Sequence, residues 1–263
     1  MTSDGAPNGH HGLFSAPRGA VLGLGYVIPR EIDVFTTGRL LVVADLIRRV
    51  LEDLHGAQVL AAVLTADAEI LEWMGTYVST VRPPSGVFAS PEVAGEAFGR
   101  PLSLLIAPDC GAELEPWLLE TAVVPVAPVH TVAPGLLDDQ DPATLRYVLA
   151  QQPYGHDLVL TPAAVEHAGA ELAVWRDRMR EWSRWPSRPV PESWRARVLT
   201  ALNDNLDITT VLAHMHEIAG DITAAAGAKF ETFAFLDRIL GVDLVRDLAR
   251  TPSTPITRRE VRR

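Results

Sequence analysis

The fold is decided between Ala20 and Thr65, where the chain reads AVLGLGYVIPREIDVFTTGRLLVVADLIRRVLEDLHGAQVLAAVLT. The apolar run at 20–28 is typical of a buried strand. Apolar residues then recur at intervals of three and four over 40–54, which predicts a helix that ends near Gly56. A second apolar run at 58–65 completes a strand–helix–strand unit, whose crossover in a parallel sheet is right-handed.

Two later apolar runs, 102–107 and 123–129, predict further strands, and prolines in the second suit an edge of the sheet. The pattern then changes to amphipathic helices, of which the first begins at Asp141-Pro142. The predicted fold class is therefore α/β followed by all-α: a compact Rossmann-type parallel-sheet domain and then a helical bundle.

This pattern divides the chain into four regions. We expect a disordered arm at 1–17, a reduced Rossmann-type domain at 18–135, a helical bundle domain at 136–250 and a mobile basic tail at 251–263. The four arginines that end the tail form its only basic cluster, which in a mobile segment is more often solubilising than a recognition site.

Composition limits the possible functions. The chain has 263 residues, of which 48% are hydrophobic, so it can bury a core. A net charge of −10 disfavours binding to nucleic acid through a broad basic surface. Lysine occurs once, at Lys229, which excludes the lysine-containing phosphate loop of P-loop nucleotide-binding proteins.

The expected location is the cytoplasm. No apolar run reaches the ~18–20 residues that span a bilayer, and the first residues lack the pattern of a signal peptide. The single cysteine, Cys110, cannot form a disulfide within the chain. We therefore expect no membrane association.

Three segments carry a family resemblance. They are VFTTGRLLVVADLIRR at 34–49, DPATLRYVL at 141–149, followed by the Tyr154 to Leu158 stretch, and ALNDNLDIT at 201–209. In this order they resemble the class I cysteinyl-tRNA synthetases and the related cysteine ligase of mycothiol synthesis. The resemblance covers most of residues 20–250 and implies a Rossmann-type nucleotide fold with a C-terminal helical domain.

The chain departs from this family at the phosphate-binding signatures. Two histidines of the family's HIGH motif contact ATP, whereas this chain has Val34-Phe35-Thr36-Thr37 or, in a shifted register, Thr36-Thr37-Gly38-Arg39. These residues either donate to an anion at a helix start or simply cap that helix. The segment 130–135 lacks the family's two signature lysines, and we expect Lys229 on a surface. We therefore predict no ordinary adenylation and ATP binding no tighter than micromolar.

The family's zinc ligands are two cysteines, a histidine and a glutamate. Here Gly25 or Ile28 takes the first cysteine position, Asp109 replaces the histidine and Glu113 retains the glutamate. We expect no zinc and no other cofactor, although Asp109, Cys110 and Glu113 with a distant His130 are the ligands that an unusual metal site would use. The candidate ligand- or nucleotide-binding residues are Thr36, Thr37, Gly38, Arg39, Asp109, Cys110 and Glu113.

Two functions follow from the resemblance and its departures. One is a synthetase-like protein without adenylation activity that binds a small molecule or a protein partner, for example in specialised metabolism. The other is an ATP-dependent or acyl-transfer ligase that joins an amino acid, cysteine first, to a small acceptor. The family's anticodon-binding region is missing, so we expect tRNA binding to be weak and salt-labile.

Overall fold

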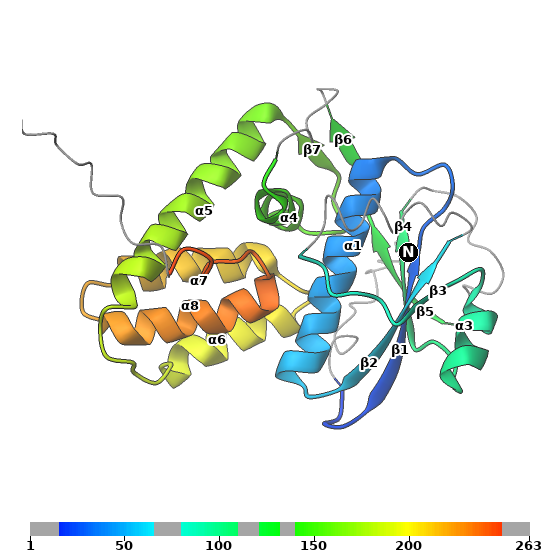
Figure 1. Ribbon diagram of the computed structural model, residues 1–263, viewed down its shortest axis with the longest axis horizontal. Helices are drawn as coiled ribbons and strands as arrows, with labels where there is room; N and C mark the ends of the chain where they lie inside the picture. Colours follow the sequence, from blue (N-terminus) through cyan, green and yellow to red (C-terminus); the bar gives the residue numbers. More distant parts are fainter. Residues whose placement is uncertain (1–15, 66–79, 110–120, 132–139, 249–263) are drawn as a thin grey trace, which may run out of the picture.

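The computed structural model describes residues 16–65, 80–109, 121–131 and 140–248 (Figure 1). Its first half is an α/β unit around a five-stranded parallel sheet in the order β3-β2-β1-β4-β5, a Rossmann-like arrangement. Central strand β1 pairs on both sides, so that Tyr26 lies opposite Val63 and Ile106. The strands are β1 (Val21–Val27), β2 (Gln58–Leu64), β3 (Gly86–Phe88), β4 (Leu104–Pro108) and β5 (Ala122–Val126).

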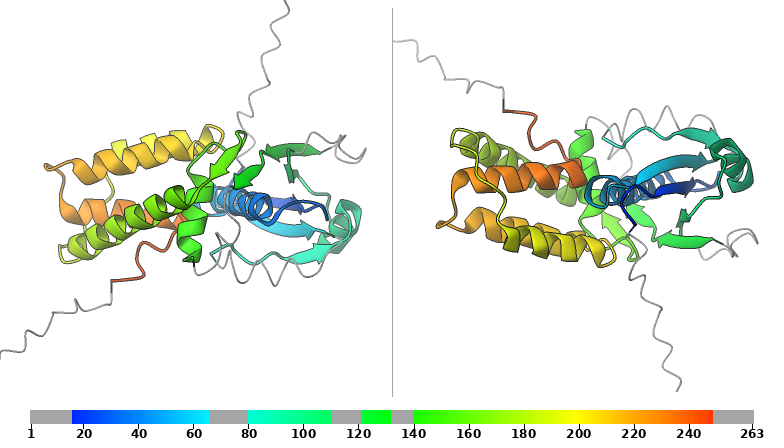
Figure 2. Two further views of the ribbon diagram at one scale, coloured as in Figure 1. Left: turned by 90° about the horizontal axis from the view of Figure 1, so that it is seen from above. Right: turned by 90° about the horizontal axis from the view of Figure 1, so that it is seen from below.

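The helices of this unit lie on opposite faces of the sheet. Helix α1 (Val34–Arg49), which continues as the π-helical turn η1 (Val50–Leu54), lies between the sheet and the later helices, and α3 (Pro91–Phe98) covers the other face (Figure 2). Helix α3 begins at the cap Ser90, whose hydroxyl accepts from the amide of Val93, and it ends at Gly99 in the left-handed conformation.

The second half, residues 140–248, is mainly helical, and we call it the helical half. Short strands β6 (Val129–Thr131) and β7 (Leu158–Leu160) form a separate parallel pair between the two halves. In the described residues, no helix is both long enough and apolar enough to cross a membrane. The helices are α4 (Pro142–Ala150), α5 (Pro162–Trp182), α6 (Glu192–Asn203), α7 (Ile208–Gly220) and α8 (Ala226–Leu240).

One continuous hydrophobic core joins the two halves. It includes Leu24 on β1, Leu46 on α1, Trp175 on α5 and Phe233 on α8, all of which are buried. A smaller cluster around Leu105 fills the space between the sheet and α3. Because α1 contributes buried side chains to the larger cluster along most of its length, it is shared by the sheet and the helical half.

The structure confirms the strand–helix–strand unit and corrects its helix. The sequence predicts a helix from Leu40, but α1 begins at Val34, because the Asp33 carboxylate accepts hydrogen bonds from the first amides of the helix. The residues Thr36 to Arg39 therefore lie within the first two turns and not in a preceding loop. The sequence reasoning also missed β3, β6 and β7, which have three residues each, and the eight-residue α3.

Several sequence expectations lie outside the described residues. These are the domain boundary near 135 and nearly all of the arm and the tail. The expected surface position of Lys229 is wrong. Lys229 is 7% exposed, because its ammonium donates to the carbonyl of Ala219 and lies 5.6 Å from the Trp182 ring.

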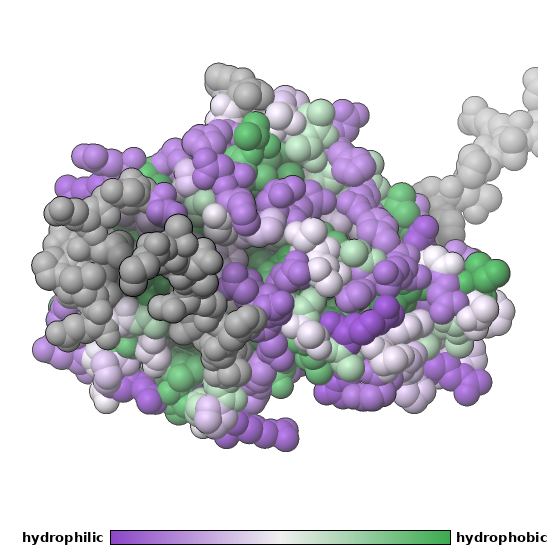
Figure 3. All heavy atoms as spheres, turned by 180° about the vertical axis from the view of Figure 1, so that it is seen from behind, coloured by the Kyte–Doolittle hydropathy of each residue, from purple (hydrophilic) through white to green (hydrophobic). Residues whose placement is uncertain are grey.

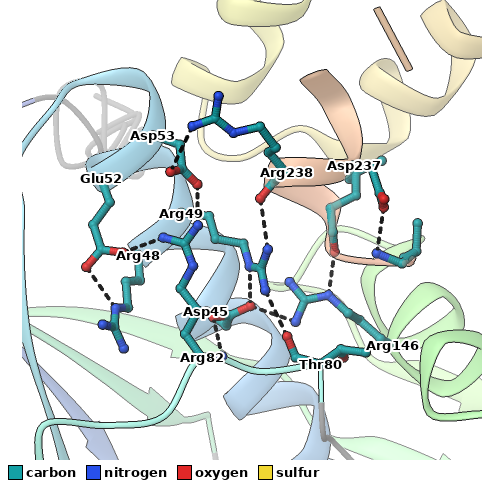
Figure 4. A network of polar contacts seen from close by, with 12 residues as sticks. Asp45, Arg48, Arg49, Glu52, Asp53, Thr80, Arg82, Arg146, Asp237 and Arg238 are labelled. Atoms are coloured by element: carbon teal, nitrogen blue, oxygen red, sulfur yellow. Dashed lines mark hydrogen bonds and ion pairs between the residues drawn. The ribbon is translucent and has the colours of Figure 1, made fainter. Parts of the chain in front are cut away.

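A buried carboxylate connects α1 to the helical half (Figure 4). The side chain of Asp45 on α1 is 1% exposed, and its Oδ2 lies 2.6 Å from Arg49 Nε and 2.7 Å from Arg146 Nη1 on α4. Its Oδ1 accepts from the amide of Arg82 at 2.9 Å. Arg146 in turn donates through Nε to the carbonyl of Leu240, the last residue of α8. Asp45 therefore joins α1, α4 and the 80–82 segment directly, and α8 through Arg146.

The electrostatics of this junction depend on the ionised carboxylate. Burial alone would raise the pKa of Asp45, but Arg146 and Arg49 outweigh burial and hold it below its usual value. Burial lowers the pKa of Arg146 to about 10, although Asp45 opposes this shift. Further out, Arg82 pairs with Glu52 and Asp53 on η1. The junction is a network of opposite charges, and the ionised Asp45 lies at its buried centre.

We predict that Asp45→Asn destabilises the protein by about 3–5 kcal/mol at neutral pH, because it leaves the buried Arg146 without a counter-charge. Urea unfolding followed by circular dichroism measures the loss. The control, Asp177→Asn, removes an exposed carboxylate paired with Arg180 and should change stability by less than about 1 kcal/mol.

The pH dependence has a definite sign. Because the folded-state pKa of Asp45 is depressed, its charge stabilises the fold above the unfolded-state pKa of about 4, and this contribution falls as the pH drops through the folded-state value. The difference in stability between wild type and Asp45→Asn should therefore shrink in acid. An equal difference at neutral and strongly acidic pH would contradict this assignment.

Candidate functional site

The candidate site lies at the carboxyl edge of the sheet, between β1 and β4. The strand order β3-β2-β1-β4-β5 places β2 on one side of β1 and β4 on the other, so the direction of the crossovers reverses at this point. In open parallel sheets, ligands bind outside the carboxyl ends of the strands at such a switch point. Thr36 to Arg39 lie here at the start of α1, and Asp109 follows β4, whereas Cys110 and Glu113 are outside the described residues.

The first turn of α1 is capped by its own carboxylate. Oδ1 of Asp33 accepts from the amides of Phe35 at 2.9 Å and Thr36 at 3.0 Å. The Thr37 hydroxyl donates to the Asp33 carbonyl at 2.9 Å. A helix N-terminus attracts anions because its first amides have no partner within the helix and because the helix dipole is positive there. Here a side-chain carboxylate of the chain already satisfies that preference.

The polar side chains of the first two turns also face inward. Thr36 is 3% exposed, and its hydroxyl oxygen accepts from the amide of Val129 at 2.9 Å, which holds β6 against α1. Thr37 is 1% exposed, and Gly38 is buried within the helix. Both threonine hydroxyls are therefore engaged in contacts within the protein.

Arg39 joins α1 to the turn after α4. Its Nη1 donates to the carbonyls of His156 at 2.6 Å and Ala127 at 3.0 Å, and its Nη2 donates to the carbonyl of Pro153 at 2.8 Å. The side chain is fully buried, and this burial lowers its pKa to about 10, against a smaller opposing effect of Asp157. Arg39 is therefore bound to main-chain oxygens that no other described cation reaches.

The same turn is held from its other side by the segment between α6 and α7. The hydroxyl of Tyr154 donates to Oδ1 of Asn205, and burial raises the pKa of this tyrosine to about 12. Asn205 and Leu206 both have positive φ, at 53° and 57°, which positions the amide side chain at the junction of α6 and α7. The turn is thus fixed between Arg39 and Asn205.

Among the described residues, the polar groups that remain accessible at this edge are mainly acidic. Asp109 is exposed, and among the described residues its backbone amide donates to the carbonyl of Val126 at 2.7 Å. His130 Nε2 lies 3.1 Å from Asp157 Oδ2, and both side chains are more than half exposed. Arg30, in the loop before α1, is the exposed arginine among the described residues here. The edge therefore favours neutral or cationic groups over phosphates.

The His130–Asp157 pair was not predicted from the sequence. The two residues are 27 positions apart, and they meet because β6 and β7 pair in parallel. Each strand has only three residues, too few for a periodic signal. Two features of the sequence could have suggested the pair. His130 is a polar residue directly after the proline-containing apolar run at 123–129, and Asp157 lies in the second family-like segment.

The structure tests the presence of a metal site only in the residues that it describes. Among the residues it describes, no three histidine, cysteine, aspartate or glutamate side chains approach closely enough to hold a metal ion. Two of the four residues proposed for an unusual site, Cys110 and Glu113, lie outside those ranges. The expected lack of zinc therefore stays a prediction.

Comparisons with known proteins do not identify a family. No family model matches the chain, and no curated protein matches it. The fold and the contacts at the carboxyl edge therefore provide the basis for a functional proposal.

We predict that Arg39→Met destabilises the protein by about 2–4 kcal/mol, because several main-chain carbonyls lose a charged donor. Arg39→Lys should recover only part of this loss, since a single ammonium cannot span carbonyls on both sides of the guanidinium. Urea unfolding gives both values. The control, Arg30→Met, changes a neighbouring exposed arginine and should alter stability by less than about 0.5 kcal/mol. If Arg39→Met were as stable as this control, the structural role of Arg39 would be refuted.

Proposed function

We propose that the chain is a protein of the cysteinyl-tRNA synthetase type that has lost amino-acid adenylation and zinc binding. It acts in the cytoplasm as a ligand-binding or partner protein. The Rossmann-like sheet followed by a helical half supports this proposal, because the resemblance implies such a domain and then a helical bundle. The observation that carries it is the capped start of α1, where the Asp33 carboxylate accepts from the amides that a phosphate would need.

The chemistry of adenylation explains why this observation matters. Attack on the α-phosphate of ATP accumulates negative charge, which enzymes stabilise with cations and with free N–H donors. At the carboxyl edge of this chain, Arg39 is bound to carbonyls, while Asp33 and Asp109 place negative charge nearby. A neutral or positively charged ligand, or a protein surface of that character, suits this edge better than ATP.

The second candidate is an acyl-transfer ligase, and the His130–Asp157 pair favours it. A neutral imidazole oriented by a carboxylate can accept a proton from an attacking amine, as in other acyl-transfer sites. The pair is open to solvent and lies beside the first turn of α1. Such an enzyme would take an amino acid, cysteine first, that is already activated, because this edge does not favour binding ATP.

We predict no ATP–pyrophosphate exchange with any proteinogenic amino acid, cysteine first. The physical reason is that, within the described part of the carboxyl edge, the buried cation Arg39 is already bound to carbonyls and few other cations are accessible. The assay follows labelled pyrophosphate into ATP, with an active cysteinyl-tRNA synthetase as the positive control. Exchange well above background with any amino acid would overturn the main proposal and favour the ATP-dependent ligase.

A second prediction concerns Asp33. Wild-type protein should bind ATP no more tightly than the micromolar range, and Asp33→Asn should bind ATP or inorganic phosphate about two- to fivefold more tightly. The reason is that the variant removes a negative charge from the start of α1 but keeps a capping oxygen. Isothermal titration calorimetry measures both affinities, with Asp177→Asn as the control. An unchanged affinity in Asp33→Asn would show that phosphate does not approach this turn, and a weaker one would show that the carboxylate does not repel it; either result contradicts the prediction.

A further inference from the structure

The surface of the helical half does not indicate a docking face by apolar character alone. Its most exposed large apolar side chains are Ile222, at 96%, and Trp185, at 62%. On the side seen in Figure 3, hydrophobic residues are scattered among hydrophilic ones in the coloured part of the surface. Scattered apolar residues are normal for a protein surface. A hollow at the other end of the molecule offers a more definite chemistry.

That hollow is a groove of about 490 Å³ between α3 and the segments that lead into β4 and β5. Its apolar lining includes Pro91, Pro101 and Leu102. Gly95 of α3 and its C-cap Gly99 also line the groove, and they project no side chains into it. These segments precede β4 and β5, so the groove lies at the amino ends of these strands, away from the candidate site. It is therefore a separate surface.

The groove carries three charged side chains in a definite pattern. Glu92, Glu96 and Arg100 line it at intervals of four residues, and none of them forms an ion pair within the described part of the chain. Residues four apart lie on one face of a helix, so the two carboxylates project from the same side of α3. The lining thus presents two negative charges and one positive charge beside an apolar floor.

The chain itself contains a segment with the complementary pattern. Residues 249–263 read ARTPSTPITRREVRR, in which Arg258 and Arg259 are followed by Glu260 and then Val261. Residues 258–260 carry two positive charges and one negative charge, which complement the two acids and one base of the groove, and Val261 matches its apolar floor. Arg250, Arg262 and Arg263 add three further positive charges to the segment. In a chain with a net charge of −10, this stretch is a concentrated source of positive charge.

The position of the two partners favours an interaction between copies. The described chain ends at Leu248, just beyond Arg246, whose guanidinium is bound to Asp141 at the start of α4 by two hydrogen bonds of 2.9 Å. Helix α3 lies at the opposite end of the molecule from the helical half (Figure 1). We propose that the groove beside α3 binds the basic segment 249–263 of a second copy of this chain. A groove-to-tail contact is heterologous, so each copy can bind the next.

The test measures self-association of the full chain by sedimentation velocity. Wild-type protein should associate between ~10 and ~300 µM at ~0.05 M salt, and this association should weaken at ~0.5 M salt. A groove variant, Glu92→Arg with Glu96→Arg, and a tail variant, Arg258→Glu with Arg259→Glu, should each associate at least about tenfold more weakly. The control, Glu166→Arg with Glu181→Arg, makes the same charge change on exposed positions of α5 and should associate like wild type.

Mixing the two variants gives the decisive result. The groove variant retains the natural tail and the tail variant retains the natural groove, so the mixture should recover association that neither variant shows alone. Circular dichroism of each variant establishes that it is folded. A wild type that stays monomeric, association that the groove variant leaves unchanged, or a mixture that stays monomeric would each overturn the proposal.

Discussion

The pairing of one buried carboxylate with two guanidinium groups constrains how the two described halves of the molecule pack against each other. Asp45 has almost no contact with solvent, and it lies between Arg49 of its own helix and Arg146 of α4. Arg146 is fully buried and also binds the last carbonyl of α8. Two cations in a dry interior require a nearby negative charge, so the position of α1 is coupled to that of the helical half. The start of α1 at the carboxyl edge is fixed as a result.

That coupling explains how a helix start can resemble a ligand site and still serve the fold. Hydroxyls, a guanidinium and a capping acid are suitable groups for holding a phosphate, and they are equally suitable for fixing a turn or a strand. In this chain Thr36 holds β6, Arg39 holds the turn after α4, and Asp33 caps the helix. The function of such residues depends on which oxygen or amide lies within reach, and that is a property of the fold.

The comparison of sequence and structure shows where periodicity is informative. The long strands and the body of α1 follow from repeated apolar positions, because a core of this size needs a regular buried face. Strands of three residues, such as β6 and β7, have no such repeat. The start of α1 at Val34 could not be predicted from apolar periodicity, because Thr36-Thr37-Gly38 interrupt it. Contacts between distant segments, including Asp45 with Arg146 and the burial of Lys229, have no local signal and required the structure.

The sequence separation of the contacts around Asp45 has a consequence for synthesis on the ribosome. Arg146 precedes its acceptor, the Leu240 carbonyl, by 94 residues, and Arg49 precedes its acceptor, the Arg238 carbonyl, by 189. A chain emerging from its N-terminus exposes the first strands and α1 long before α8 exists to cover them. Until then the apolar side of α1 is open to other nascent chains. The α1 surface is therefore fully covered only once α8 has been synthesised. A chain that terminates before α8 should aggregate and not form a smaller folded domain.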